Sequence, residues 1–225
     1  MNQAITKRTT HMTNPVLPIT GGLYKHYLNR NLEVMEYAVR LYGKVFALRF
    51  DLRVPLEYNY DDTNLVTRFI SSLKAQLNAH YQRKQRQSDR YVHTTELLYV
   101  WTREEGSYGK PHYHFCIFLN GNAHSFLGTI ELGRDNMYNR IVNAWRSALG
   151  THSTLDSAWA FDPCLVSIPP NCEYLLEREK PGFNRLYKDL YKRLSYLTKV
   201  ESKPRGDGVN CYGTSRVPKV VFHGV

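Results

Sequence analysis

Residues 111–119 read PHYHFCIFL. Apolar side chains occupy every second position of this stretch, and that alternation is typical of a β-strand with one buried face. The buried face is an unbroken stripe of Tyr113, Phe115, Ile117 and Leu119. His112 and His114 share the opposite face, where both imidazoles can reach one ion. Polar sheet faces that bind nothing show the same pattern, so a metal site needs a third ligand nearby.

A carboxylate is the expected third ligand, because divalent cations held by two histidines commonly take one. A turn-rich segment separates the histidine strand from a preceding strand that ends at Glu104. If the hairpin pairs Glu104 with His112, the carboxylate projects to the histidine face. Glu105 has the wrong parity unless a bulge intervenes, and Asp51, on the polar face of an earlier strand, is the second candidate. We therefore predict a metal site of His112, His114 and Glu104, with Asp51 and Glu105 as alternatives.

The rest of the chain surrounds this strand with helices and further strands. Apolar residues at helical spacing predict helices over about residues 24–42, 61–86, 132–149 and 183–200. Strict alternation predicts a half-buried strand over 44–53, and shorter patterns predict strands over 91–104 and 164–168. The resulting order contains a β-α-β-β-α-β core. That order indicates an α+β fold of the ferredoxin or RNA-recognition type: a mainly antiparallel sheet with helices packed on one face and the other face free for a site.

The two ends of the chain differ in composition from the middle. Residues 1–22 contain two prolines and a Gly-Gly end, which predicts a flexible N-terminal arm. Residues 23–202 hold all the periodic segments and are expected to form one domain. Residues 203–225 form a basic, Gly-containing tail that we expect to pack on or near the site.

The last predicted helix carries one tyrosine in an unusual setting. At 100° per residue, Leu190, Leu194 and Leu197 define its buried stripe, with Tyr187 and Tyr191 at the rim. Tyr196 lies on the other side, among the cations Arg185, Lys188, Lys192 and Lys199. Nearby cations stabilise a phenolate, which is the form that a tyrosine nucleophile needs. Tyr196 is therefore the candidate nucleophile and Lys199, one turn away, its partner; an exposed aromatic on a solvated helix is the plain alternative.

Composition narrows the class of partner. The chain has 30 Lys and Arg against 20 Asp and Glu, a net charge of +10, and it contains 17 tyrosines. Cations interleaved with aromatic rings suit single-stranded nucleic acid, whose bases stack while its phosphates are neutralised. No apolar run is long enough for a membrane helix, so no membrane partner is expected. The four cysteines show no Cys-x-x-Cys spacing, which argues against a structural zinc site and suits a reducing cytoplasm.

His112-Tyr113-His114 followed by Tyr196-Leu197-Thr198-Lys199 resembles the paired motifs of HUH-type nucleases. Further segments at 47–52, 111–115, 144–145, 195–199 and 213–216 resemble the replication proteins of filamentous phages and their prophage-encoded relatives of the YagK/YfjJ type. The resemblance spans about residues 23–216, and it implies that residues 23–202 form an HUH endonuclease domain. The implied activity is metal-dependent nicking and rejoining of single-stranded DNA, as in a rolling-circle replication initiator of a bacterial host cytoplasm.

The same resemblance implies roles for individual residues. Mg²⁺ or Mn²⁺ on the histidine site would polarise the scissile phosphate, and Tyr196 would form a 5′-phosphotyrosine intermediate that Lys199 helps to stabilise. Single-stranded DNA or an origin hairpin is the implied partner, with a host helicase and polymerase as further candidates. The expected DNA-backbone contacts are Arg49, Arg53, Lys188, Lys192, Arg205 and Arg216.

Two other functions fit parts of the sequence. A non-catalytic origin-binding or regulatory protein on the same fold would bind DNA tightly and form no covalent adduct. A structural or virion-associated basic protein would leave the combination of Tyr196, Lys199 and the histidines unexplained.

Overall fold

The computed structural model describes residues 4–55, 58, 62–105, 109–150, 162–201, 203–204 and 206–218. Its centre is a six-stranded sheet in the order β10-β6-β7-β5-β8, with β9 also paired to β5. The long strands are β5 (Lys44–Arg53), β6 (Leu98–Glu105) and β7 (Pro111–Asn120). The short ones are β8 (Val166–Ser167), β9 (Glu173–Glu177) and β10 (Tyr212–Thr214). Every pairing in this sheet is antiparallel, so the α+β class with a mainly antiparallel sheet is confirmed.

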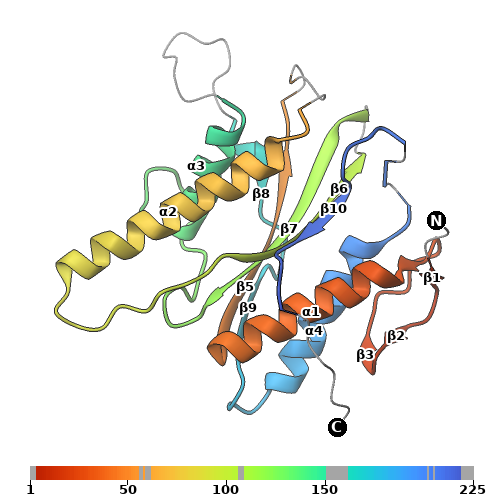
Figure 1. The fold of residues 1–225 in the computed structure, drawn as a ribbon, viewed down its shortest axis with the longest axis horizontal. Helices are drawn as coiled ribbons and strands as arrows, with labels where there is room; N and C mark the ends of the chain where they lie inside the picture. The colour runs from red at the N-terminus through yellow and green to blue at the C-terminus, as the bar shows by residue number, and fades with distance from the viewer. Residues whose placement is uncertain are drawn as a thin grey trace.

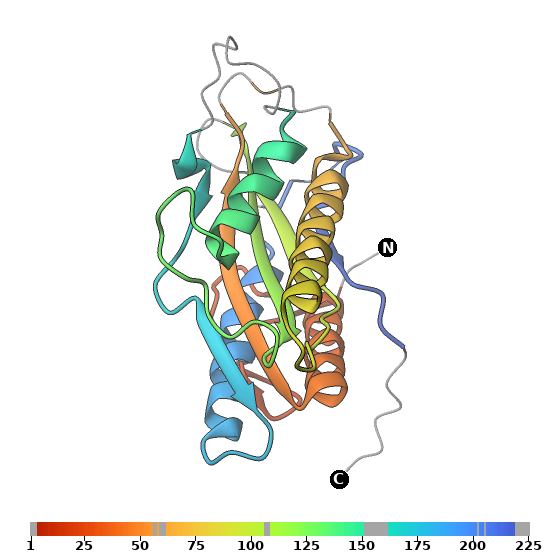
Figure 2. The same cartoon turned by 90° about the vertical axis from the view of Figure 1, so that its left-hand side faces the viewer.

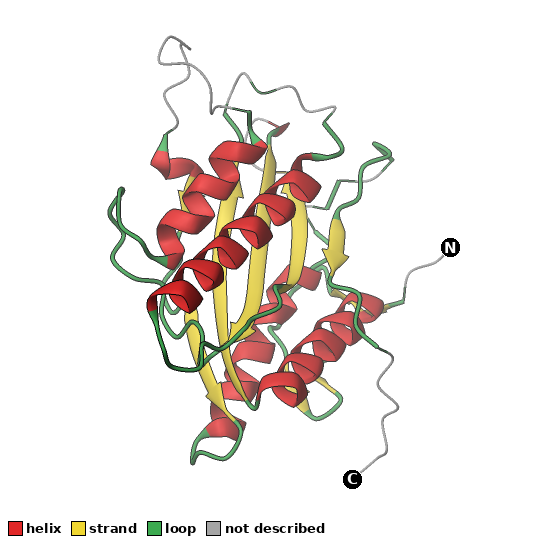
Figure 3. Cartoon of the chain, turned by 60° about the vertical axis from the view of Figure 1, so that its left-hand side comes forward, coloured by secondary structure: helices red, strands yellow, loops and turns green. Residues whose placement is uncertain are grey.

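The four α-helices of the described residues cover the sheet, two on each face (Figures 1 and 2). The helices α2 (Leu65–Gln87) and α3 (Met137–Ala148) pack on one face, whereas α1 (Lys25–Tyr42) and α4 (Phe183–Ser195) pack on the other. Figure 3 shows the strands enclosed between the two layers of helices. The prediction that all helices lie on one face was therefore wrong. The physical reason is that β5, β6 and β7 are apolar on both faces over most of their length, so both faces need cover.

Alternation along the strands divides the apolar residues between two cores. Phe50, Phe115 and their neighbours of the same parity contact α2 and α3, where Phe69 and Trp145 complete an aromatic cluster. Residues of the opposite parity, such as Ala47, Cys116 and Phe118, contact α1 and α4. The histidine face is therefore apolar at one end of the strands and polar at the other, and α1 and α4 cover only its apolar end.

The N-terminal segment, which the sequence predicted to be an arm, lies against the body of the protein. It contains β1 (Ile5–Thr6), β2 (Thr10–His11) and β3 (Asn14–Pro15), and it leads into β4 (Leu23–Tyr24). Val16 is buried, and His11 Nδ1 lies 2.5 Å from Tyr191 Oη of α4. Tyr191 is consequently fully buried, whereas a single helical wheel placed it at the rim.

Several further elements were absent from the sequence prediction or differ from it. β9 and β10 were not predicted, because each is short and lies at an edge of the sheet. The predicted helix over 183–200 ends at Ser195 and continues as the 3₁₀ turn η3 (Tyr196–Thr198). A second 3₁₀ turn, η2 (Pro163–Leu165), precedes β8. Among the residues that the structure describes, no helix combines the length and the apolar character needed to cross a bilayer.

Candidate metal and tyrosine site

Three adjacent strands bring the polar residues of the histidine face into register. Across the sheet, Asp51 of β5 lies opposite His114 of β7, and Glu104 of β6 lies opposite His112. The predicted pairing of Glu104 with His112 is therefore confirmed, and no bulge brings Glu105 to this face. Since side chains directly opposite each other on one face have their Cβ atoms about 5 Å apart, the register alone gathers these groups into one cluster.

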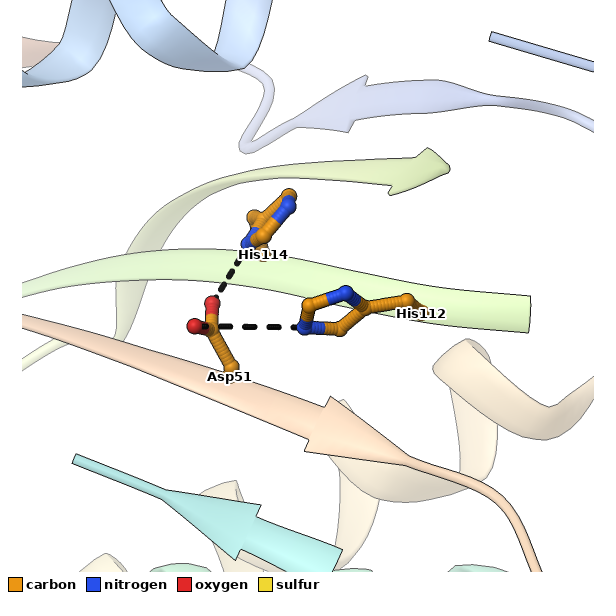
Figure 4. A group of neighbouring side chains, drawn as sticks. All are labelled: Asp51, His112 and His114. Atoms are coloured by element: carbon orange, nitrogen blue, oxygen red, sulfur yellow. Dashed lines mark hydrogen bonds and ion pairs between the residues drawn. The ribbon is translucent and has the colours of Figure 1, made fainter. Parts of the chain in front are cut away.

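Asp51 lies between the two imidazoles (Figure 4). Its Oδ1 is 2.5 Å from His114 Nδ1, and its Oδ2 is 3.9 Å from His112 Nε2. Burial opposes ionisation of Asp51, but the hydrogen bond to His114 and the charge of Arg49 outweigh it and lower the pKa to about 2. Burial lowers the pKa of His112 to about 4, helped by the neighbouring imidazole of His114. At neutral pH the cluster therefore offers an ionised carboxylate beside a neutral imidazole at His112.

Arg49, predicted to contact the DNA backbone, has its side chain inside the protein. It is 4% exposed, forms an ion pair with Asp51 and places a guanidinium nitrogen 2.6 Å from His114 Nδ1. The prediction for Arg49 needs correction, because a buried guanidinium that holds Asp51 is not available to a phosphate of the backbone. Its parity on the strand was right; what the sequence could not show is that its guanidinium is buried against Asp51 of β5 and His114 of β7.

Glu104 connects the histidines to two lysines. Its Oε2 lies 3.1 Å from His114 Nε2 and 2.8 Å from Lys199 Nζ, and its Oε1 lies 3.3 Å from Lys203 Nζ. Burial alone would raise the pKa of this carboxyl, but these partners together hold it well below its usual range. Glu104 is thus ionised and already bound by two ammonium groups.

Tyr196 stands at the edge of the same cluster. It opens the turn η3 directly after α4, and its ring meets the His114 ring edge-on with centroids 5.4 Å apart. Lys199 Nζ donates a hydrogen bond of 2.8 Å to the phenol oxygen. Although burial opposes it, the pKa of Lys199 is raised by its hydrogen bonds to Glu104 and Tyr196, so this lysine carries a positive charge next to the phenol. Three structural elements that are distant in sequence therefore meet at Tyr196.

Comparisons with known proteins bear on this geometry. A model of the YagK/YfjJ C-terminal domain matches residues 6–215. The chain belongs to the YagK/YfjJ C-terminal domain family. It is 35% identical over 207 residues to uncharacterized protein YfjJ of Escherichia coli K12, covering 87% of this chain and 96% of YfjJ. It is 32% identical over 200 residues to uncharacterized protein YagK of the same strain, covering 85% of this chain and 92% of YagK. No solved structure matches the chain.

In this YagK/YfjJ-type domain, the groups that could hold a metal ion are Asp51, His112 and His114. One ligand atom from each lies within 4.8 Å of the others, and the described residues contain no other such group of three. His112 Nε2 supplies an independent test of fit. Among the buried side-chain nitrogens and oxygens of the described residues, it and Arg103 Nε are the two without a hydrogen-bond partner. A buried imidazole nitrogen that faces a carboxylate and lacks a donor or acceptor is the atom a cation would satisfy.

The remaining predicted DNA contacts of this YagK/YfjJ-type domain lie at different distances from the cluster. Arg53 is exposed at the end of β5, opposite His112, so it borders the site. Lys188 and Lys192 are exposed on α4, and Arg216 is exposed just after β10. Arg205 lies outside the described residues. Of these predicted DNA contacts, Arg53 is the one that the sheet register places beside a candidate metal ligand, His112.

The sequence analysis did not identify Lys203 as a member of the cluster. Lys203 has a side chain only 1% exposed and lies against Glu104, and burial lowers its pKa. It follows η3 in a segment without helical or strand periodicity, so no spacing rule points to it. The one signal was its place in the basic tail, which we expected to pack on or near the site.

Proposed function

We propose that the protein is an HUH-type tyrosine endonuclease that nicks and rejoins single-stranded DNA, as the initiator of rolling-circle replication does. The observation that carries the proposal is the meeting of Tyr196 with a His-x-His strand, an acidic residue and a lysine in one cluster. Each motif alone is weakly specific. Their spatial convergence is what the activity requires, because nucleophile, phosphate and cation must meet at one point.

Asp51, His112 and His114 are the residues that would hold Mg²⁺ or Mn²⁺. When bound, the cation supplies a Lewis acid that polarises the scissile phosphate and stabilises its developing charge. Asp51 contributes the negative charge and His112 a neutral imidazole, while Arg49 fixes the carboxylate from the buried side. Glu104, the ligand expected from strand parity, acts in this proposal through Lys199 instead.

In the proposed reaction, Tyr196 is the nucleophile of a transesterification at the phosphate. Tyr196 Oη attacks phosphorus and forms a new Oη–P bond, the phosphorus keeps its bond to the 5′-oxygen, and the bond from phosphorus to the 3′-oxygen breaks. The phenol proton is released to solvent and the departing 3′-oxygen takes one up, which leaves a free 3′-hydroxyl. Lys199 steadies the developing phenolate, and Glu104 keeps that lysine in place. One phosphodiester-type bond replaces another, so a later 3′-hydroxyl can reverse the step and rejoin the strand.

The decisive experiment looks for the covalent intermediate. The purified chain is incubated with Mn²⁺ and a randomised single-stranded DNA library, labelled at the 3′ end in one reaction and at the 5′ end in another. We expect a denaturation-resistant protein–DNA species that carries the 3′ label and not the 5′ label. Excess chelator should abolish it.

Variants at two tyrosines assign the nucleophile. Tyr196→Phe should bind DNA but form no adduct, whereas Tyr191→Phe should remain active because that phenol is buried against His11 and Leu28. An adduct formed by Tyr196→Phe and lost in Tyr191→Phe would contradict the assignment. Tight, salt-dependent binding of DNA by the unaltered protein with no adduct would identify the alternative, a non-catalytic origin-binding protein.

A further inference from the structure

The far end of α2 extends beyond the core. Residues 78–87, all of them described, include no buried side chain, whereas the first part of the helix buries Leu65, Phe69, Leu73 and Leu77. The segment that follows turns back beneath this overhang before β6 begins (Figure 1). An exposed stretch of helix without an apolar stripe gains little stability from packing. Either other interactions stabilise this end of α2, or this end of the helix has another function.

A cavity of about 740 Å³ lies between this overhang, residues 88–97 and residues 122–124. That volume falls in the range of small-ligand sites, roughly 300–1,000 Å³. The wall is fixed by hydrogen bonds to the body of the protein. Glu96 N donates to Tyr42 Oη at 2.7 Å, and Asn120 donates to Thr94 O and Thr95 Oγ1 at 2.9 and 2.8 Å. These hydrogen bonds hold the wall of the cavity against the body of the protein.

The lining of the cavity combines cations with aromatic rings. Lys74, Lys84 and Arg90 line it, against one carboxylate, that of Glu96. Tyr91 is 80% exposed, the largest exposure among the big apolar side chains of the described residues, and its ring meets that of His93 at 4.9 Å. An exposed tyrosine ring beside an excess of cations suits a nucleotide whose base is unstacked and whose phosphate carries charge.

This cavity is distinct from the Tyr196 cluster. It is lined by α2, which covers the sheet face opposite to α1 and α4. It also lies at the other end of β7, since Asn120 lies eight positions after His112, about 26 Å along a strand. A single nucleotide cannot occupy both places.

We propose that the cavity is a second nucleic-acid site, which binds a few nucleotides of a single strand. The phosphates lie against Lys74, Lys84 and Arg90, and one unstacked base lies on Tyr91. A single strand is favoured over a duplex because stacked, paired bases expose no face to Tyr91. The proposal does not depend on nicking at Tyr196.

The test measures binding without chemistry. Tyr196→Phe protein, full length and without divalent metal, is titrated into a fluorescent oligothymidylate of about twelve residues, and anisotropy is followed at several salt concentrations. Adding Tyr91→Ala should weaken binding about tenfold, while Tyr91→Phe, which keeps the ring, should stay within about twofold. Lys84→Gln should reduce the slope of log affinity against log salt by about 0.7. Lys180→Gln, which removes an exposed cation that does not line the cavity, should change nothing.

A second measurement locates the strand. Photo-crosslinking with 4-thiothymidine should label the tryptic peptide of residues 91–103, and Tyr91→Ala should abolish that label. Unchanged affinity in Tyr91→Ala, or crosslinks only outside residues 91–103, would overturn the proposal. So would thymidine monophosphate binding as tightly as the oligonucleotide, because the site would then be one for a free nucleotide. Absence of a Tyr196 adduct in the unaltered protein would count against the nicking proposal alone.

Discussion

Replacing Glu104 with glutamine tests whether this carboxylate holds the site together. Glu104 is 4% exposed and accepts contacts from His114, Lys199 and Lys203. Glutamine keeps the shape and one carbonyl acceptor but removes the negative charge. Lys203, whose side chain is 1% exposed, would then be a buried cation that has lost the carboxylate with which it pairs.

The expected cost follows from that burial. Removing one partner of a buried ion pair costs about 3–5 kcal/mol, because the other charge is left uncompensated. Glutamine can still accept one hydrogen bond, so we expect about 3 kcal/mol. For a chain of this size, that lowers the melting temperature by about 6–12 °C. The double variant Glu104→Gln/Lys203→Met removes the stranded cation as well and should return to within about 1 kcal/mol of the unaltered protein.

Urea unfolding, followed by tryptophan fluorescence and circular dichroism, measures both variants against the unaltered protein. The two probes should give coincident transitions if unfolding is two-state. A loss below about 0.5 kcal/mol for Glu104→Gln would mean that its charge is not holding Lys203. A double variant no more stable than the single one would refute the reasoning equally, since the cost would then not arise from the unpaired lysine.

Three further predictions concern the metal ligands, the response to acid and a helix cap. Asp51→Asn should weaken Mn²⁺ binding by about tenfold or more in calorimetry, and more than Glu104→Gln does, because Asp51 is the carboxylate grouped with the histidines. Burial lowers the pKa of His124 in the folded protein to about 3, whereas in the unfolded chain this imidazole binds a proton as the pH falls below about 6.5. The free energy of unfolding should therefore decline from about pH 6.5 towards pH 3. His124→Gln should make the urea midpoint less pH-dependent. Asn136 caps α3 by accepting a hydrogen bond from Asn139 N at 3.0 Å, so Asn136→Ala should cost about 1 kcal/mol in urea unfolding, while Ala at exposed Asn143 should cost less than about 0.5 kcal/mol.

The sequence predicted the parts of the fold that depend on local pattern. The alternation in residues 44–53 and 112–119 predicted two central strands almost to the residue, and parity placed His112, His114 and Glu104 on one face. Parity could not rank Glu104 against Asp51, because it says which face a carboxylate occupies and not what else binds it. The two lysines that pair with Glu104 come from the chain after α4, where no periodic pattern points to them.

The cover of the second sheet face could not be predicted from periodicity in the same way. Positions such as Ala47 and Cys116 are small and share a face with Arg49 and His114, so the face looks polar in the sequence. Only the packing of α1 and α4 shows that it is polar at one end alone. Likewise, a wheel at 100° per residue cannot describe Tyr196, because the helix tightens to a 3₁₀ turn at that residue.

Three contacts join the N-terminal segment to the turn η3, which contains Tyr196, and to the residues on either side of that turn. Val200 N donates to Gly22 O at 3.0 Å, Leu23 forms an isolated bridge with Lys199, and Leu17 N donates to Ser195 Oγ at 2.9 Å. A shortened version of the protein that starts near α1 would lose all three contacts at once. If such a truncated protein is inactive, the cause would be the lost support of the turn η3 and not the loss of a catalytic group. Purification tags are therefore better attached where they leave these three contacts undisturbed.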